Sequence, residues 1–295
     1  MPDGIGVSGR HHGELFQGAL RRDGELVRCL ITLPIVGVGS TARYVSVDSV
    51  LNVSPSWKIK ALRALELTLQ FLGEPASGLL DIQCTAPTGV GLGSSTCDVV
   101  ATIRAVSRAH GRVLDPRDIA RLAIEAEGAS DPVMFDEMVL FAQRQGRVLE
   151  SFGPWVPPFT VLSIDTDAGA GGVNTLGLGL PAYTDAELAA FEGLLSRARA
   201  AFAARDASTI AAIAGESAAI NQRFLPMRGF QGIRDLAAEF GAWGVQISHS
   251  GTLAGVLFDA SLNAQDDADL MGRLTASVRA LGLRPLGTFG VHLGN

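Results

Sequence analysis

The stretch that decides the fold is "APTGVGLGSSTCDVVAT", residues 86–102. Three glycines, Gly89, Gly91 and Gly93, stand between a predicted strand and a predicted helix. Glycine permits backbone angles and close approaches that a Cβ atom would forbid. The free N–H groups at a helix N-terminus attract anions. The stretch therefore predicts a loop that holds a phosphate group against the start of a helix.

Two familiar glycine loops do not fit this stretch. A P-loop requires a lysine after its last glycine, and none follows here. A dinucleotide-binding loop requires a second strand that ends in an acidic residue about 20 positions on. Asp115 and Asp118 lie near that distance, but they open a predicted helix. The motif alone also fits a simple turn at a helix start, so the rest of the chain must decide.

Composition limits the classes of protein that the chain can belong to. With 295 residues, of which 47% are hydrophobic, it can bury a sizeable core. The net charge of −6 and the lack of a long basic run argue against a nucleic-acid partner. No apolar run is long enough for a membrane span or a signal peptide, so we expect a soluble cytoplasmic protein. Cys29, Cys84 and Cys97 are widely spaced, which predicts buried thiols rather than disulfides or a zinc site.

Apolar periodicity and turn residues predict strands and helices that alternate irregularly. We expect short strands within residues 5–50, separated by glycine and aspartate turns, and further strands at 78–84, 146–152, 159–167, 243–250, 253–259 and 284–294. Helices are predicted at 58–72, 95–111, 116–128, 185–204, 207–223, 229–240 and 265–281. The pattern lacks a regular βαβ repeat and predicts an α+β fold of two domains. A Pro-rich turn at 153–158 marks the boundary, giving domains 1–155 and 156–295.

Three motifs in a fixed order point to one family. Residues 87–96 satisfy the pattern P-x-x-x-G-L-G-S-S-[TA]; "GRHHGELFQG" (9–18) precedes it, and "QISHSGTLAGVLFD" (246–259) follows. In this the chain resembles the GHMP family of small-molecule kinases, although Gly9 replaces the usual proline of the first motif. The resemblance implies an N-terminal ribosomal-S5-like nucleotide-binding domain and a C-terminal ferredoxin-like domain. It also implies ATP and Mg²⁺ as cofactors.

Within that family the chain is most similar to the branch of L-threonine kinases that serve cobalamin side-chain synthesis. "GELFQG", "SDPVMFDEMVLF", "INQRFLP" and "SHSGTLAGVLFD" carry this similarity. The H-x-D-N or G-x-D-N segment of homoserine and mevalonate kinases is replaced by "EGASDPVMF" (127–135). The implied acceptor is a small amino acid with a hydroxyl group, above all L-threonine. Alternatives are a homoserine or other small-alcohol kinase, and a non-catalytic protein that binds a nucleotide or ligand as a regulator.

The resemblance also implies the roles of individual residues near the phosphates. Nucleotide-binding residues would be Pro87, Gly89, Val90, Gly91, Leu92, Gly93, Ser94, Ser95 and Thr96. Ser95 and Glu127 would bind Mg²⁺, with Glu125 as the alternative to Glu127 or as a solvated helix charge. Asp131 would orient or deprotonate the acceptor hydroxyl, and is favoured over Asp136 by its place in the motif.

The acceptor side is less well specified by the sequence. We expect Glu14 near the substrate, where its carboxylate would accept from an amino group, and Ser250 and Gly251 beside it. His11 and His12 would point to opposite faces of a strand, so they cannot bind one metal ion together. Two other features stay open between substrate contact and structure: His249 before the glycine turn, and Asn221 with Gln222 at a helix end. A homodimer is also left open.

Overall fold

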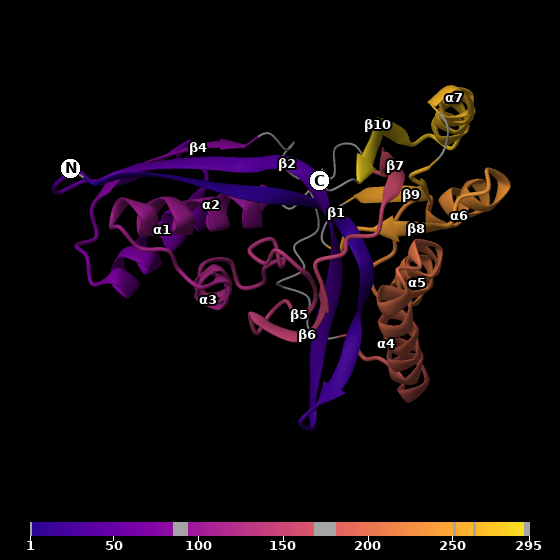
Figure 1. The fold of residues 1–295 in the computed structure, drawn as a ribbon, viewed down its shortest axis with the longest axis horizontal. Coiled ribbons are helices and arrows are strands. Elements are labelled where there is room, and N and C mark those ends of the chain that lie inside the picture. Colours follow the sequence, from indigo (N-terminus) through magenta and orange to yellow (C-terminus); the bar gives the residue numbers. More distant parts are fainter. Residues whose placement is uncertain (1, 85–93, 168–180, 250–251, 262–263, 292–295) are drawn as a thin grey trace.

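The computed structural model describes residues 2–84, 94–167, 181–249, 252–261 and 264–291. In this part of the chain ten strands form one sheet, with the order β10-β7-β9-β8-β1-β2-β4-β3, and β5 and β6 branch from β2. The strands β1 (Asp3–Arg22) and β2 (Glu25–Val45) form a long antiparallel hairpin that runs through the middle of the molecule (Figure 1). Other elements gather on either side of this hairpin.

The elements on one side come from the first half of the chain. They are β3 (Leu51–Ser54), α1 (Ile59–Leu72), β4 (Gly78–Cys84), α2 (Ser94–Ala109), α3 (Pro116–Glu127), β5 (Met138–Ala142) and β6 (Arg147–Gly153). The helix α2 lies directly on β1. A Cβ atom on Gly6 of β1 would lie 2.0 Å from the carbonyl oxygen of Ala101 in α2. Only a glycine permits this close contact between strand and helix.

The elements on the other side come from the second half of the chain. They are β7 (Phe159–Asp165), α4 (Asp185–Ala204), α5 (Ala207–Asn221), α6 (Phe230–Glu239), β8 (Gly244–Ile247), β9 (Leu253–Asp259), α7 (Ala264–Ala280) and β10 (Arg284–Val291). The helices α4 to α7 lie against the strands β7 to β10 and the hairpin (Figure 1). The predicted helices and the later strands are confirmed to within a few residues.

In the N-terminal half one prediction was wrong, and one strand was not predicted. The region 5–50 does not contain several short strands, because β1 and β2 are 20 and 21 residues long. Glycines that predicted turns lie inside these strands, and Gly13 instead coincides with a shift of register. The strand that was not predicted is β5, which has five residues whose side chains are all buried. Its continuous apolar run carries no alternation that would reveal a strand.

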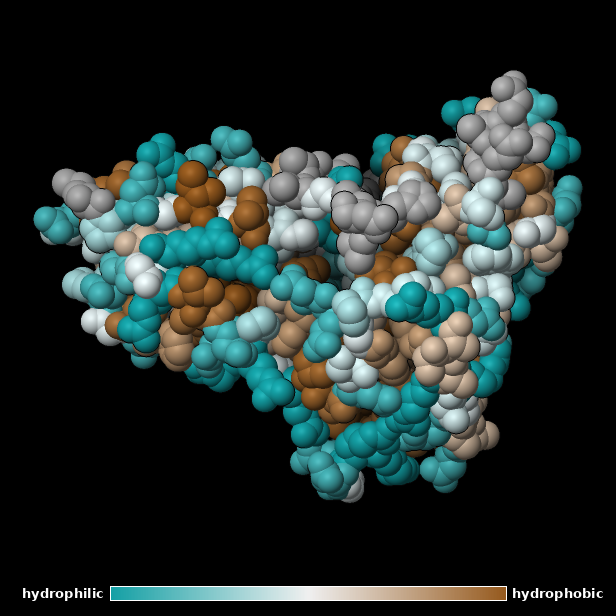
Figure 2. Space-filling view, in the orientation of Figure 1, coloured by the Kyte–Doolittle hydropathy of each residue, from teal (hydrophilic) through white to brown (hydrophobic). Residues whose placement is uncertain are grey.

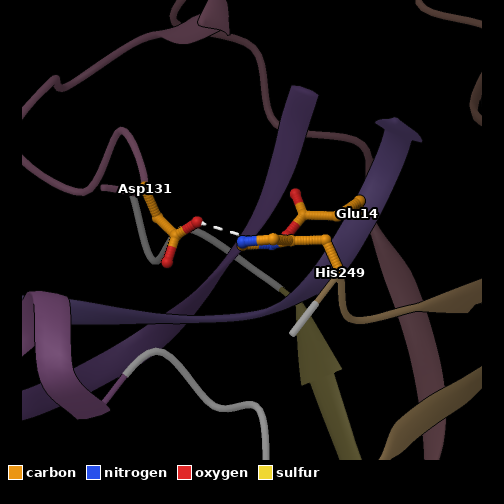
Figure 3. A group of neighbouring side chains, drawn as sticks. All are labelled: Glu14, Asp131 and His249. Atoms are coloured by element: carbon orange, nitrogen blue, oxygen red, sulfur yellow. Dashed lines mark hydrogen bonds and ion pairs between the residues drawn. The ribbon is translucent and has the colours of Figure 1, made fainter. Parts of the chain in front are cut away.

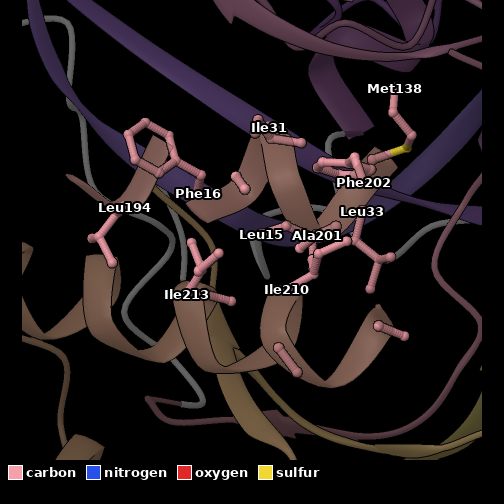
Figure 4. Close-up of a cluster of buried hydrophobic side chains, with 14 of the residues drawn as sticks. Leu15, Phe16, Ile31, Leu33, Met138, Leu194, Ala201, Phe202, Ile210 and Ile213 are labelled. Atoms are coloured by element: carbon pink, nitrogen blue, oxygen red, sulfur yellow. The ribbon is translucent and has the colours of Figure 1, made fainter. Parts of the chain in front are cut away.

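The largest hydrophobic cluster joins the hairpin to the helices of the second half. Phe16 and Ile31 of the hairpin pack with Leu194 of α4 and Ile210 of α5 (Figure 4). The first residues of the chain thus share a core with residues beyond 190. The division into domains 1–155 and 156–295 stays a prediction.

The cysteines and the surface agree in part with expectation. Cys29 and Cys97 are buried, whereas Cys84 is only half-buried. Burial raises the pKa of the Cys29 thiol to about 12, so it stays protonated. On the face drawn in Figure 2, hydrophobic residues form separate patches among hydrophilic ones. Among the described residues, no helix has the length and apolarity to cross a bilayer.

Candidate active site

Asp131 lies in the segment after α3, and its side chain reaches the middle of the hairpin. Nε2 of His11 donates a hydrogen bond of 2.9 Å to Oδ2 of Asp131, and the hydroxyl of Thr96 lies 3.4 Å from the same oxygen. Asp131 is buried. Burial alone would raise the pKa of its carboxyl, but the imidazoles of His11 and His249 hold it well below its usual range. The carboxylate is therefore ionised at any working pH.

Glu14 approaches the same place from β1. Gly13 has a φ of +61° at a shift in the register of β1, where Glu14 pairs with Ile247 of β8. A Cβ atom on Gly13 would lie 1.8 Å from Oε1 of Gln246. This glycine conformation aims the next side chain inward. The hydroxyl of Thr32 in β2 donates a 2.8 Å hydrogen bond to Oε2 of Glu14.

His249 faces both carboxylates. Its Nδ1 lies 3.2 Å from Oε1 of Glu14 and 3.8 Å from Oδ1 of Asp131 (Figure 3). Burial alone would lower the pKa of His249, but the hydrogen bond to Glu14 and the charge of Asp131 raise it. The three side chains come from the first, middle and last thirds of the chain.

Ser95 and Glu127 meet at the start of α2, which begins at Ser94. The hydroxyl of Ser95 donates a 2.9 Å hydrogen bond to one oxygen of Glu127, and that of Thr96 donates one of the same length to the other. Burial raises the pKa of Glu127 to about 7. A buried carboxylate beside a serine hydroxyl offers the oxygen ligands that Mg²⁺ takes. These two residues therefore fit a magnesium ion, whereas Glu125 is exposed on α3.

Positive charge lies next to this pair. Nζ of Lys60 lies 3.8 Å from Oε2 of Glu127, and Lys58 forms an ion pair with Asp98. Both lysines line a cleft of about 260 Å³ together with Ser94 and Ser95. The sequence analysis did not single out either lysine. The only available signal was their place in the first turn of a helix, which does not reveal the distant partner.

A second cleft, of about 360 Å³, lies beside the hairpin. It is lined by His11 and Thr32, the residues that hold Asp131 and Glu14, and by apolar side chains such as Phe135 and Val139. Asp136 lines this cleft and is exposed. The structure thus brings Asp131, and not Asp136, to Glu14 and Thr96.

His11 and His12 separate as the strand geometry requires. His11 faces Asp131, whereas the ring of His12 hydrogen-bonds Ser163 of β7 at 2.8 Å and the amide of Gln246 in β8. Burial lowers the pKa of His12 to about 3, so this ring is neutral. The two rings face different partners, as predicted.

Asn221 and Gln222 make structural contacts. The amide of Asn221 donates to the carbonyl oxygens of Gln17 and Ser217 and accepts from the hydroxyl of Tyr183. Just after the end of α5, Oε1 of Gln222 accepts a hydrogen bond from the backbone N–H of Met227. The side-chain groups of Asn221 are therefore occupied within the protein.

Several predicted site residues lie outside the described residues. They are Pro87, Gly89, Val90, Gly91, Leu92, Gly93, Ser250 and Gly251. Their assignments stay predictions. The described residues that flank them, Ser94 and His249, are both at the candidate site.

The chain matches two known domain families and curated proteins. The GHMP kinases N terminal domain matches residues 59–136, and the GHMP kinases C terminal domain matches residues 198–271. A curated L-threonine kinase of Salmonella typhimurium is 24% identical over 263 residues, which cover 89% of this chain and 84% of that protein.

Solved structures share the fold at lower identity. A homoserine kinase from Cytophaga hutchinsonii has a TM-score of 0.73 at 15% identity, covering 99% of this chain and 95% of its own. MDDEF in complex with MVAPP, AMPPCP and magnesium has a TM-score of 0.71 at 17% identity, covering 98% and 97%. At such identities the likeness establishes the two-domain architecture with its mixed α/β composition.

Proposed function

We propose, because this chain belongs to the GHMP kinase family, that it transfers the terminal phosphoryl group of ATP to the hydroxyl of a small amino acid. The acceptor we propose is L-threonine, and the product is O-phospho-L-threonine. The observation that carries the proposal is the contact of Thr96 with both Glu127 and Asp131. This contact joins residues suited to the phosphates to a carboxylate suited to a hydroxyl.

The similarity to curated L-threonine kinases over most of the chain supports this acceptor. A place in cobalamin side-chain synthesis is part of the same proposal. The apposition of Glu14 and Asp131 agrees with an acceptor that carries both an amino group and a hydroxyl group.

Phosphoryl transfer requires the protein mainly to position the reactants and to neutralise charge. In our proposal residues 87–96 bind the nucleotide phosphates, and Lys60 adds positive charge beside them. Ser95 and Glu127 would hold Mg²⁺, which would neutralise charge on the phosphate oxygens when bound. Asp131 would accept a hydrogen bond from the acceptor hydroxyl and so orient its oxygen toward the phosphorus. A strongly lowered pKa suits this orienting role better than early proton removal, because such a carboxylate is a weak base.

The test is the release of ADP from ATP and Mg²⁺ with a panel of acceptors. The panel contains L-threonine, L-serine, L-homoserine, mevalonate and simple sugars, each at the same concentration. We expect the largest kcat/KM with L-threonine and a phosphorylated product of the corresponding mass. Faster turnover of homoserine or mevalonate would replace the proposed acceptor. Nucleotide binding without turnover of any acceptor would indicate a regulator instead.

A further inference from the structure

Each carboxylate of the site has one oxygen held by a residue of the hairpin and a second oxygen that faces His249. Oε2 of Glu14 accepts from Thr32, and Oδ2 of Asp131 accepts from His11. The second oxygens, Oε1 of Glu14 and Oδ1 of Asp131, lie 3.2 Å and 3.8 Å from Nδ1 of His249. One carboxylate oxygen of each residue and one ring nitrogen lie within 4.8 Å of one another. The side chains converge on one point (Figure 3). The supporting hydrogen bonds therefore fix an arrangement that presents two acceptor atoms together.

Oδ1 of Asp131 has no hydrogen-bond donor among the described residues. The oxygen is also buried. A buried carboxylate oxygen normally accepts hydrogen bonds, because leaving it unpaired is costly. The imidazole of His249 lies 3.8 Å away, beyond hydrogen-bond distance. This oxygen is therefore available to a donor that the described residues do not supply.

We propose that Glu14 and Asp131 form a binding subsite for the protonated amino group of the acceptor, which rests on the proposed function and makes amino alcohols its substrate class. An ammonium group carries three N–H donors and a positive charge, so it can donate at once to Oδ1 of Asp131 and to the lone pair of Glu14 Oε1 that His249 does not use. Oδ1 keeps a second lone pair for the acceptor hydroxyl. A sugar hydroxyl would bring no positive charge to the two carboxylates. A carboxylate-bearing alcohol without an amine would be repelled.

In the free protein, His249 occupies the place proposed for the ammonium group of the acceptor. Its Nδ1 hydrogen-bonds Oε1 of Glu14 at 3.2 Å, and its pKa is raised, after the lowering effect of burial is overcome, by the carboxylates that it faces. When protonated, the ring supplies the positive charge that the acceptor ammonium would replace. The preference for an amine then resides in the carboxylates and not in the imidazole.

Glu14→Gln and His249→Ala separate these contributions. The acceptors compared are L-threonine and 3-hydroxybutyrate, which lacks only the amino group. We expect native protein to prefer threonine by about 1,000-fold in kcat/KM, as sites built around a substrate's polar group do. In Glu14→Gln, kcat/KM for threonine should fall by about 100-fold while that for 3-hydroxybutyrate stays nearly unchanged. His249→Ala should retain the preference for threonine.

Glu216→Gln is the matched control, since Glu216 is an exposed carboxylate of α5 paired with Arg197. It should behave as the native protein does. An equal loss for both acceptors in Glu14→Gln, or equal use of both acceptors by native protein, would overturn the subsite. Thermal melting and nucleotide affinity of each variant show that it is folded.

Binding measurements keep this test apart from that of the kinase reaction. If no acceptor yields ADP, the proposed function fails, and titration calorimetry in the presence of a non-hydrolysable ATP analogue then tests the subsite alone. Binding of threonine but not of 3-hydroxybutyrate, lost in Glu14→Gln, supports the subsite. Absence of threonine binding overturns it. Stoichiometric binding of Zn²⁺ or Mn²⁺ without nucleotide, lost in both Glu14→Gln and His249→Ala, would overturn it in favour of a metal centre.

Discussion

Asp131 lies between two imidazoles, and these determine what its carboxylate can do. His11 holds one oxygen at 2.9 Å, and His249 lies 3.8 Å from the other. Asp131→Asn keeps the size of the side chain but removes its charge, so the acceptor hydroxyl would lose its oriented acceptor. We expect kcat to fall by about 10²–10⁴-fold with little change in KM for ATP. Steady-state kinetics on the purified variant measure both.

The control for this substitution is Asp136→Asn, in the same segment. Asp136 is exposed and lines the neighbouring cleft, so most of the activity should remain. Near-normal turnover of Asp131→Asn would refute the assignment. Native protein should also lack an acid limb from this carboxylate in its pH–rate profile, because the pKa of Asp131 is strongly lowered.

Ser95 has two roles that measurement can separate. Its hydroxyl donates to Glu127 and lies in the first turn of α2. If Ser95 binds Mg²⁺, Ser95→Ala should lower kcat by at least about tenfold and raise the Mg²⁺ concentration needed for half-maximal rate. A structural role at the helix start alone predicts about 1 kcal/mol of lost stability with near-normal turnover. Urea unfolding and Mg²⁺ titration of the rate together distinguish the two results.

The sequence predicted the residue types of the site better than their contacts. Motif order indicated Ser95, Glu127, Asp131 and Glu14, and the structure brings the first three into one hydrogen-bonded network. It did not predict that His11 holds Asp131. Such a partner 120 positions away leaves no local pattern in one sequence, because only the folded sheet brings the two together.

The strand β1 shows why boundaries of elements were harder to predict than their existence. It contains a run of ten consecutive buried residues, 11–20, that does not alternate and that includes Gly13 and Gly18. Local rules read such glycines as turns. In the structure they permit close contacts, since a Cβ atom on Gly18 would lie 2.6 Å from the ring of Phe191. The signal for the strand lies in its partners rather than in its own pattern.

Gly13 links this strand to the site, which leads to a prediction. Gly13→Ala would place a Cβ atom 1.8 Å from Oε1 of Gln246 and 3.0 Å from the backbone of Ile247, at a φ of +61°. We expect a loss of roughly 2–4 kcal/mol in the free energy of unfolding. Because Glu14 would be displaced, kcat/KM for the acceptor should also fall. KM for ATP should change less. Urea unfolding and acceptor kinetics measure the two effects.

Gly24→Ala provides the matched comparison for the same backbone strain. Gly24 has a φ of +82° in the turn between β1 and β2, and a Cβ atom there would meet nothing within 4 Å. The expected loss in the free energy of unfolding is therefore only the cost of the left-handed conformation, about 1 kcal/mol. The kinetics of the variant should be normal. If the two variants lose equal stability, close packing at Gly13 is not what requires a glycine.

At the scale of the whole molecule, the continuous sheet is what assembles the site. The hairpin pairs with β4 on one side and, through Glu14 and Ile247, with β8 on the other. Opposite sides of the molecule thus contribute Asp131 and His249 to one place. The α+β class followed from the order of predicted elements. The single sheet did not, because pairing between distant strands is not encoded in local periodicity.

His12 connects these halves and makes their stability depend on pH. Its ring accepts from the amide of Gln246, hydrogen-bonds Ser163 at 2.8 Å and packs on Phe289 at 4.9 Å between ring centres. Burial lowers its pKa from 6.5 to about 3. Between these values the unfolded chain binds a proton that the folded protein does not, so stability decreases as the pH falls through this window. The full effect is on the order of 5 kcal/mol.

Glu127 acts in the opposite direction over part of this range, so a single stability curve would conceal the effect of His12. Its pKa is raised from 4.5 to about 7, and stability therefore decreases as the pH rises between these values. The comparison of native protein with His12→Gln removes this contribution, because both carry Glu127. We expect the variant to be less stable near pH 7, where it lacks the ring contacts. The difference should shrink steadily toward pH 4, since only the native protein loses stability through the histidine. Urea unfolding of both proteins at half-unit steps measures it, and parallel curves would show that His12 titrates normally in the folded protein.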